Sequence, residues 1–518
     1  MTQAADLVLL DGEVHTLAEP DETHEAIAIR DGRIVRVGRT SEIEHLEGVE
    51  TEAIHCEGRV VLPGFVDAHT HMESLGQYLV HADLSSAESL EDAIGMLEDQ
   101  AETDREWILG FGYDESEWPE TRYPTREDLD DVSDDRPVVA MRVDMHTASL
   151  NSEALDRLVA EMPDADVETE GGEPTGVVVE DATEAVWNAV EADYDETREL
   201  LVAAIDHATS LGVTGVHDKV RQSHAPRVYR DLDLSGELDM RVRVDYWSDH
   251  LESAIDVGLA TNAGSELVET GAIKSFTDGS IGAKTAKLFE PFADVNEAAD
   301  DVGDGRGQWV VEPDELAEIA TEATAHDYQL TVHAIGDEAI EETVAVLEET
   351  ENVDGARHRI EHVELATDDQ LERMADAGIV ASMQPNFHQW AQPGGLYDQR
   401  LGETRRKHSN RLRDVLDAGV PLALGSDCMP LDPLLGIHHA VKAPEECQRL
   451  SVTEALRGYT LGAAHAGFDD DRLGTVEVGK CADLVMLEES PWEHDDRIDE
   501  IDVASTIVDG RIVYDGAE

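Results

Sequence analysis

The sequence predicts an α/β fold: a (β/α)8 barrel of the TIM type, a small β-sandwich domain built from both termini, and a lobe inserted after the first barrel strand. Two observations predict it. Short apolar strands alternate with helical stretches through the middle of the chain, and short strands joined by turns recur at both ends. A length of 518 residues suits this plan, because such a barrel takes ~250 residues or more. We assign residues 1–59 and 466–518 to the composite β-domain and residues 60–465 to the barrel, with an insert at about 85–195.

The two chain ends consist of short apolar strands separated by turn residues. Gly12, the pair Asp31 and Gly32, and Gly38 supply turns in the first 60 residues. The strands expected there span residues 6–10, 12–16, 26–29 and 33–37. After residue 470 the expected strands span residues 474–476, 482–487 and 505–514. Two strand-rich ends that flank one barrel predict a single β-domain to which both termini contribute.

Eight apolar segments are the predicted barrel strands, the number needed to close the barrel. They span residues 60–67, 213–217, 240–246, 272–276, 329–333, 359–363, 379–383 and 421–425. The first two are too far apart for an ordinary connection, so we expect an inserted lobe between them. An insertion after the first strand leaves the barrel at its catalytic face, where it could cover a substrate.

The charge balance is strongly acidic, with 116 Asp and Glu against 38 Lys and Arg and a formal net charge of −78. Only seven of the basic residues are lysines. Such a surface repels itself until salt screens it, and molar salt shortens the Debye length to roughly 3 Å. The composition resembles that of a cytosolic protein from a halophile that accumulates salt. It argues against nucleic acid and anionic membrane as partners; we expect a small-molecule substrate, with a homodimer as one option for assembly.

The cysteines and the apolar runs indicate the cellular compartment of the protein. Cys56, Cys428, Cys447 and Cys481 form no CxxC pair, and four cysteines in so long a chain do not suggest a disulfide scaffold. No basic segment with an apolar core stands at the N-terminus, and the apolar runs are far shorter than ~20 residues. We therefore expect a protein of the reducing cytoplasm.

Residues 64–71, Gly-Phe-Val-Asp-Ala-His-Thr-His, are the most informative part of the chain. They follow an apolar run and end in two histidines that are two residues apart. Side chains at i and i+2 of a strand point to the same face, so His69 and His71 can bind one metal ion together. A bare His-x-His pair is common by chance, but this one lies at the C-terminal end of a strand, where barrels keep their chemistry.

Further ligand-type side chains stand at the ends of later predicted strands. Each has a simple alternative explanation, because a lone strand histidine is usually structural and an Asp after Gly-Ser could cap a helix. Their occurrence in order, each at a strand end, favours a metal site at the mouth of the barrel. The set consists of His69, His71, Lys274, His333, His362 and Asp427.

Lys274 needs an explanation of its own, because an ammonium group cannot ligate a cation. The lysine could be neutral, or it could be carboxylated by carbon dioxide so that the two carbamate oxygens bridge two metals. The alternative is an ordinary ion pair between Lys274 and Asp278 without any bridge.

Several motifs in these segments resemble the amidohydrolase superfamily. They are the segment 64–71, His-Ala-Ile-Gly-Asp at 333–337, Arg-His-Arg-Ile-Glu-His at 357–362 and Gly-Ser-Asp at 425–427. Residues 118–126, 274–282 and 432–436 are similar to amidohydrolase family 3, the branch of N-substituted formamide deformylase and exoenzyme regulatory proteins. The resemblance implies two divalent ions, usually zinc. It places His69, His71 and Asp427 on one ion, His333 and His362 on the other, and carboxylated Lys274 between them.

With this ligand set, the resemblance implies hydrolysis of a C–N bond in an amide, formamide or cyclic amide. A hydroxide that bridges two metals is a nucleophile at neutral pH, and Asp427 would take its proton and deliver it to the leaving amine. His146 in the insert is a second catalytic candidate, for substrate orientation, and a purely structural role is equally open. Weaker candidates for substrate binding are Asp278, Arg359, Gln384 and Asn386.

Two other functions remain open from the sequence. One is a mononuclear deaminase or deacetylase of the same superfamily, in which Lys274 stays unmodified. The other is a non-catalytic sensor or regulator that binds a small molecule without turnover. The complete set of metal ligands argues against it. The sequence does not identify the substrate.

Overall fold

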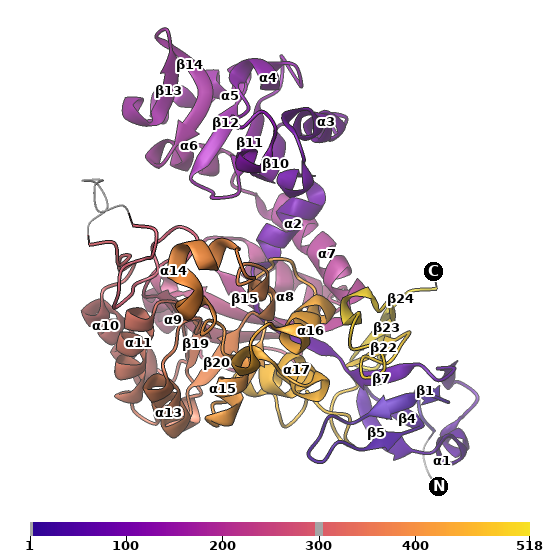
Figure 1. Ribbon diagram of the computed structural model, residues 1–518. Coiled ribbons are helices and arrows are strands. Elements are labelled where there is room, and N and C mark those ends of the chain that lie inside the picture. The colour runs from indigo at the N-terminus through magenta and orange to yellow at the C-terminus, as the bar shows by residue number, and fades with distance from the viewer. Residues whose placement is uncertain (1–3, 296–303, 518) are drawn as a thin grey trace. The chain divides into compact units, whose positions relative to one another are not determined.

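A computed structural model describes residues 4–295 and 304–517, and its central sheet has eight parallel strands (Figure 1). The strands pair in the order β21-β20-β19-β18-β17-β16-β15-β8. Their bounds are β8 Phe65–Thr70, β15 Val213–Val220, β16 Arg241–Trp247, β17 Val268–Phe276, β18 Leu330–Ala334, β19 Arg359–His362, β20 Val380–Met383 and β21 Leu422–Leu424. All eight predicted barrel segments therefore overlap a strand of this sheet, and the barrel prediction is confirmed.

The first and last strands are joined just beyond the end of β21. The Asp427 amide donates to the His69 carbonyl at 2.8 Å, and the Ser426 amide donates to the Asp67 carboxylate at 3.0 Å. These bonds bring the segment after β21 to the C-terminal end of β8. Residues that are more than 350 positions apart in sequence thereby become neighbours at one end of the barrel.

The predicted first barrel strand, residues 60–67, is wrong in one respect, because the segment is two strands. β7, Val60–Pro63, pairs with β2 and β22 of the terminal sheet, and the barrel strand β8 begins at Phe65. Pro63 lacks an amide hydrogen and so interrupts a ladder. Gly64 then lets the chain pass close to Thr214, whose side chain a Cβ at this position would strike. The continuous apolar run concealed this change of sheet.

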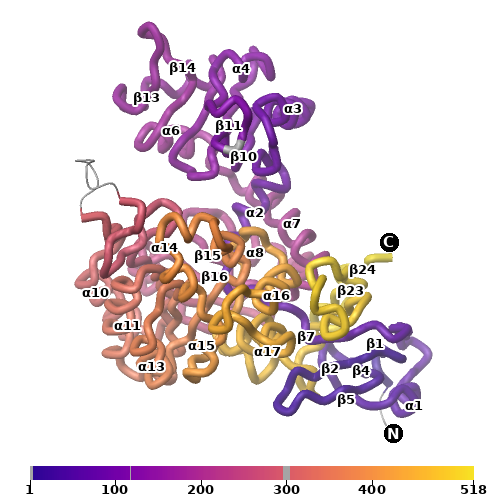
Figure 2. Tube along the Cα trace, viewed as in Figure 1, coloured from indigo at the N-terminus to yellow at the C-terminus, as the bar shows by residue number. Residues whose placement is uncertain are grey.

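The termini form two further sheets, and strands from both ends of the chain lie side by side (Figures 1 and 2). One has the order β5-β4-β1-β6, with β1 Leu7–Leu10, β4 Ala26–Arg30, β5 Arg33–Gly38 and β6 Glu52–His55. The other has the order β24-β23-β22-β7-β2-β3, with β2 Glu13–His15, β3 Thr23–His24, β22 Leu484–Leu487, β23 Val503–Val508 and β24 Arg511–Asp515. Leu9, Ile27, Val61 and Leu484 share one apolar cluster between them. Residues 1–3 and 518 of the predicted β-domain lie outside the described ranges.

Helices cover the outer side of the barrel strands, and their apolar faces build its largest core cluster. α13 shows why these segments are helical: Thr367 and Gln370 form a capping box at its start, and Gly378 ends it in the left-handed conformation. The main helices of this part are α8 Ala225–Ser235, α9 Leu251–Val257, α10 Pro313–Ala325, α11 Asp337–Glu348, α13 Asp368–Ala377, α14 Leu396–Arg406, α15 Leu412–Asp417, α16 Pro433–Lys442 and α17 Val452–Arg457. None of the helices in the described ranges is long and apolar enough to cross a bilayer.

The inner side of the barrel is polar where most barrels carry branched apolar side chains. In β19, Ile360 packs into the outer apolar core, whereas Arg359 and Glu361 alternate with it and lie buried on the other face. Lys219 of β15 and Asp245 of β16 form a fully buried ion pair. Buried charges are costly unless they are paired, and these four side chains form two pairs, Arg359 with Glu361 and Lys219 with Asp245. Both pairs lie next to the candidate metal centre described below.

Residues 72–204 and 223–228 form a separate compact unit. Its sheet has the order β13-β14-β12-β11-β10-β9, with helices packed around it. The strands are β9 Ala82–Asp83, β10 Ile108–Tyr113, β11 Val138–Arg142, β12 Thr147–Leu150, β13 Val167–Glu170 and β14 Glu173–Val179. The helices include α2 Met72–Val80, α3 Leu90–Ala101, α4 Arg126–Asp130, α5 Ser152–Leu158, α6 Asp181–Ala189 and much of α7 Tyr194–Ser210. The predicted insert falls in this unit; its role over the substrate stays a prediction.

Candidate metal centre

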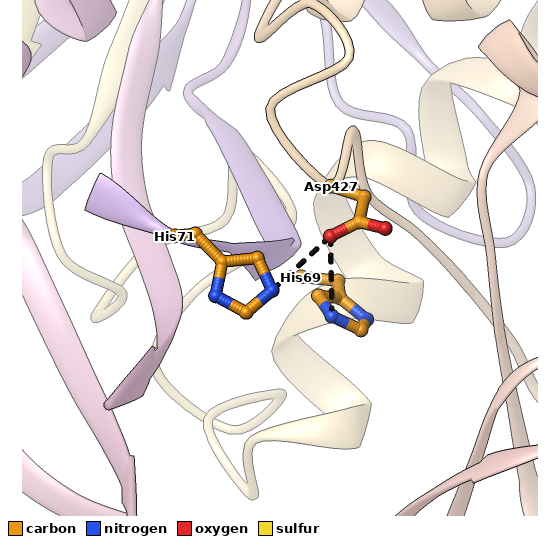
Figure 3. A group of neighbouring side chains, drawn as sticks. All are labelled: His69, His71 and Asp427. Atoms are coloured by element: carbon orange, nitrogen blue, oxygen red, sulfur yellow. Dashed lines mark ion pairs between the residues drawn. The ribbon is translucent and has the colours of Figure 1, made fainter. Parts of the chain in front are cut away.

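His69, His71 and Asp427 converge at the C-terminal end of β8 (Figure 3). The Nε2 atoms of His69 and His71 lie 3.5 and 3.2 Å from Oδ1 of Asp427. Ligand atoms of the three side chains all lie within 4.8 Å of one another. Two imidazole nitrogens and a carboxylate oxygen at this spacing can bind one divalent ion, and they are the ligand types that zinc uses.

Asp427 is held in an unusual backbone conformation. Asp427 and Cys428 have φ values of 57° and 56°, in the left-handed region, just after β21. The Asn386 amide group donates to the carbonyls of Ser426 and Met429 at 2.9 and 2.7 Å and so fixes the loop on both sides. Burial alone would raise the pKa of Asp427, but His69 and His71 outweigh it and lower that pKa well below its usual value. The carboxylate is therefore ready to ligate.

His69 is buried, and its two ring nitrogens have different partners. Nδ1 lies 2.6 Å from Oε2 of Glu361, whereas Nε2 faces Asp427. Burial, followed by the charge of Lys274, lowers the pKa of His69 well below its usual value. The ring is thus neutral at physiological pH. A neutral imidazole with one nitrogen already engaged presents the other as a metal ligand.

His333 and His362 lie beside this group, with ring centroids 4.5 Å apart, and the His362 ring is 5.1 Å from that of His69. Nε2 of His333 is 3.1 Å from the Gly279 carbonyl, so Nδ1 is its available nitrogen. Nδ1 of His362 contacts Oε1 of Gln384 at 2.7 Å, so its available nitrogen is Nε2. Burial is the main reason that the pKa of His362 falls to about 4. Strand alternation would place His362 with Ile360, on the outer face, but its φ of 75° ends the regular strand there.

Lys274 is fully buried, and its Nζ has no hydrogen-bond partner among the described residues. The ammonium position lies 4.8 Å from the centroid of the Phe276 ring. Burial lowers the pKa of Lys274 to about 8. Asp278 does not pair with Lys274; its carboxylate accepts bonds from the backbone amides of Lys287, Ile335 and Gly336. A buried amine without a partner fits carboxylation, because carbon dioxide reacts with the neutral form.

The remaining predicted site residues have structural contacts. Asp278 binds the backbone at the start of α11, and Gln384 and Asn386 hold His362 and the Asp427 loop. Arg359 is 1% exposed and pairs with Glu361 at 2.8 Å. His146 belongs to the separate unit of residues 72–204, where its side chain is 72% exposed and lies 3.7 Å from Glu180. Substrate binding by these five residues stays a prediction; the contacts of the first four favour supporting roles.

Glu361, Lys219 and Asp245 were not predicted as site residues from the sequence. Glu361 lies between two predicted site residues, Arg359 and His362. One signal was available: Arg359 and Glu361 alternate with Ile360 in a strand that should be apolar on both faces. Charged residues at such positions indicate a polar site inside the barrel.

This fold and this donor set define a metal-dependent hydrolase. The model of the Amidohydrolase family matches residues 52–514, and the chain belongs to that family. It is therefore an enzyme, of a class that hydrolyses carbon–nitrogen bonds other than peptide bonds.

Individual relatives cover nearly the whole chain. The chain is 30% identical to Protein LONG AFTER FAR-RED 3 of Arabidopsis thaliana, over 98% of this chain and 92% of that protein. It is 28% identical to N-substituted formamide deformylase of Arthrobacter pascens, over 99% of each. A solved structure of an uncharacterized metal-dependent hydrolase from Pyrococcus furiosus is 31% identical and superimposes with a TM-score of 0.80, over 94% of this chain and 99% of that one.

Proposed function

We propose that the protein hydrolyses the C–N bond of an amide, formamide or cyclic amide at a centre of two zinc ions. His69, His71 and Asp427 would hold one ion, His333 and His362 the other, with carboxylated Lys274 between them. The convergence of His69, His71 and Asp427 at one end of the barrel carries this proposal. The likeness to a formamide deformylase over the full chain supports the substrate class.

Divalent ions bound here would turn water into a hydroxide nucleophile near neutral pH and polarise the substrate carbonyl. The protein must then move one proton. Oδ1 of Asp427 is the oxygen that faces both imidazoles, and Oδ2 has no hydrogen bond to any described residue. Oδ2 is therefore free to accept a proton and to deliver it to the leaving nitrogen.

The surrounding side chains keep this geometry fixed. Gln384 fixes the tautomer of His362 by accepting from Nδ1, and the Gly279 carbonyl does the same for His333 through Nε2. Asn386 holds the loop of Asp427. Each of the three histidines buried at this site, His69, His333 and His362, therefore keeps one nitrogen free for metal. Ligands that need no rearrangement favour tight binding.

Turnover by metal-depleted and zinc-reconstituted protein tests the proposal. The assay would use molar potassium chloride and a panel of formamides, N-acyl amino acids, hydantoins and lactams. We expect hydrolysis of at least one class that depends on added metal. His71→Ala should abolish it, whereas His55→Ala, at a histidine that is 61% exposed and paired with Asp11, should not. A protein that binds zinc yet cleaves none of these classes would contradict the proposal.

A mononuclear deaminase or deacetylase is the second candidate. One observation favours it: among the described residues, the group of three ligand atoms within 4.8 Å contains His69, His71 and Asp427 but neither His333 nor His362. In that case Lys274 stays an unmodified amine. Metal content separates the two functions, because the binuclear enzyme needs about two ions per chain and the mononuclear one about one.

A further inference from the structure

Glu361 lies beneath the candidate metal centre and is completely buried. Its Oε2 accepts from Nδ1 of His69 at 2.6 Å. Its Oε1 accepts from the hydroxyl of Thr331 and forms an ion pair with Nη2 of Arg359 at 2.8 Å. Both carboxylate oxygens are thus occupied by fixed donors, and one of these donors is a metal ligand.

Arg359, the charge partner of Glu361, is itself fixed from three other sides. Its guanidinium donates to the Ala68 carbonyl and lies 2.7 Å from Nδ1 of His217 and 2.9 Å from Oγ of Ser382. A buried carboxylate loses its hydration and is destabilising unless a partner compensates its charge. Here the pair with Arg359 compensates the charge and leaves one oxygen directed at His69.

The backbone around His69 is held equally firmly. The Ala68 carbonyl accepts from Arg359 and also from the buried Nζ of Lys219, 3.2 Å away. The His69 amide donates to Asp67 at 3.0 Å, and its carbonyl accepts from the Asp427 amide at 2.8 Å. Apart from Nε2, every hydrogen-bonding atom of His69 therefore has a protein partner.

We propose that Glu361, anchored by Arg359 and Thr331, is the positioning residue that sets the metal affinity of this site through His69. It keeps the proton on Nδ1 and fixes the ring plane, so that the Nε2 lone pair always faces the ion. His71 differs, since its side chain is 31% exposed and no described carboxylate other than Asp427 contacts its ring. The inference rests on the proposed function only in requiring that a metal binds at His69.

The test is zinc affinity, measured by competition with a chromophoric chelator in molar potassium chloride, without substrate. Glu361→Gln keeps the side-chain volume but puts a neutral amide in place of a carboxylate that accepts from His69 and Thr331 and pairs with Arg359. We expect zinc binding roughly 10- to 100-fold weaker, the usual effect of losing such a partner. Glu269→Gln is the matched control, because Glu269 is also a largely buried strand carboxylate, paired with Arg243 at 2.6 Å. It should bind zinc as the wild type does.

Equal zinc affinity in Glu361→Gln and the wild type would overturn the inference, and so would equal weakening in both variants. If Glu361→Gln does not fold, Thr331→Val decides, because it removes one anchor of Glu361 and keeps the pair with Arg359. That variant should bind zinc roughly two- to tenfold more weakly, the range of a single hydrogen bond; unchanged affinity would overturn the inference. Absence of metal in the wild type would overturn the proposed function as well.

Discussion

Asp427→Asn separates the ligand role of Asp427 from its role in proton transfer. Asparagine has nearly the same volume as aspartate and keeps one side-chain oxygen. In the wild type, Oδ1 of Asp427 lies 3.5 Å from Nε2 of His69 and 3.2 Å from Nε2 of His71, and the asparagine oxygen can take the same position. The backbone should not change, because asparagine tolerates the left-handed φ of 57° at this position and the amide bond to the His69 carbonyl remains. The amide nitrogen that replaces Oδ2 cannot accept a proton.

The magnitude follows from what general acid–base catalysis contributes, typically ~10²–10⁴-fold. At ~1.36 kcal/mol per factor of ten, this is a barrier higher by roughly 2.7–5.4 kcal/mol. We expect kcat to fall by that factor and KM to change little, because the proton moves only in the transition state. The loss of one ligand charge should weaken metal binding as well, so kcat is compared at saturating zinc.

The assay is steady-state kinetics on a substrate accepted by the wild type, with metal content measured on the same samples. Asp432→Asn is the matched control: Asp432 caps α16 by accepting from the Leu435 amide at 3.0 Å, and asparagine caps equally well. Its kcat should stay unchanged. Near-normal kcat in Asp427→Asn with full metal content would show that Asp427 is only a ligand, and His146 would be the next candidate for the proton acceptor.

Three further predictions concern other parts of the molecule. Lys274→Ala should lose metal and activity, with partial rescue by a short carboxylic acid that replaces the bridge; full metal occupancy in this variant would count against carboxylation. The unfolding temperature should rise steeply with potassium chloride up to molar concentrations, since the formal charge of −78 repels itself until screened; calorimetry that finds equal stability in low and molar salt would exclude the halophilic interpretation. His146→Ala should raise KM if this histidine orients the substrate, and unchanged kinetics would assign it a structural role.

Much of the barrel was predictable because its strands are short apolar segments with ligand-type residues at their ends. The positions of His69 and His71 followed from the period of a strand. The boundary at Gly64 did not, because residues 60–62 are as apolar as a barrel strand and the strands that pair with them, β2 and β22, lie far away in sequence.

The supporting residues were harder to predict than the ligands. Gln384 and Asn386 were expected near the mouth, but not that they hold His362 and the Asp427 loop. Their partners are 22 and 40 residues away, and only the closed barrel brings them together. Glu361 was missed because its partner His69 lies 292 positions away. The charges that alternate with Ile360 mark a polar face of the strand, but nothing local in the sequence identifies the distant partner of Glu361.

The number of metal ions per chain would show whether the end of β8 holds a binuclear centre. The protein would be reconstituted with zinc in molar potassium chloride, freed of unbound metal and analysed by mass spectrometry, beside the variant His69→Ala. We expect about two zinc ions per wild-type chain and a marked loss in the variant. About one ion would favour the mononuclear enzyme. A wild type that retains no zinc, or a variant that retains as much as the wild type, would contradict a metal centre at the end of β8.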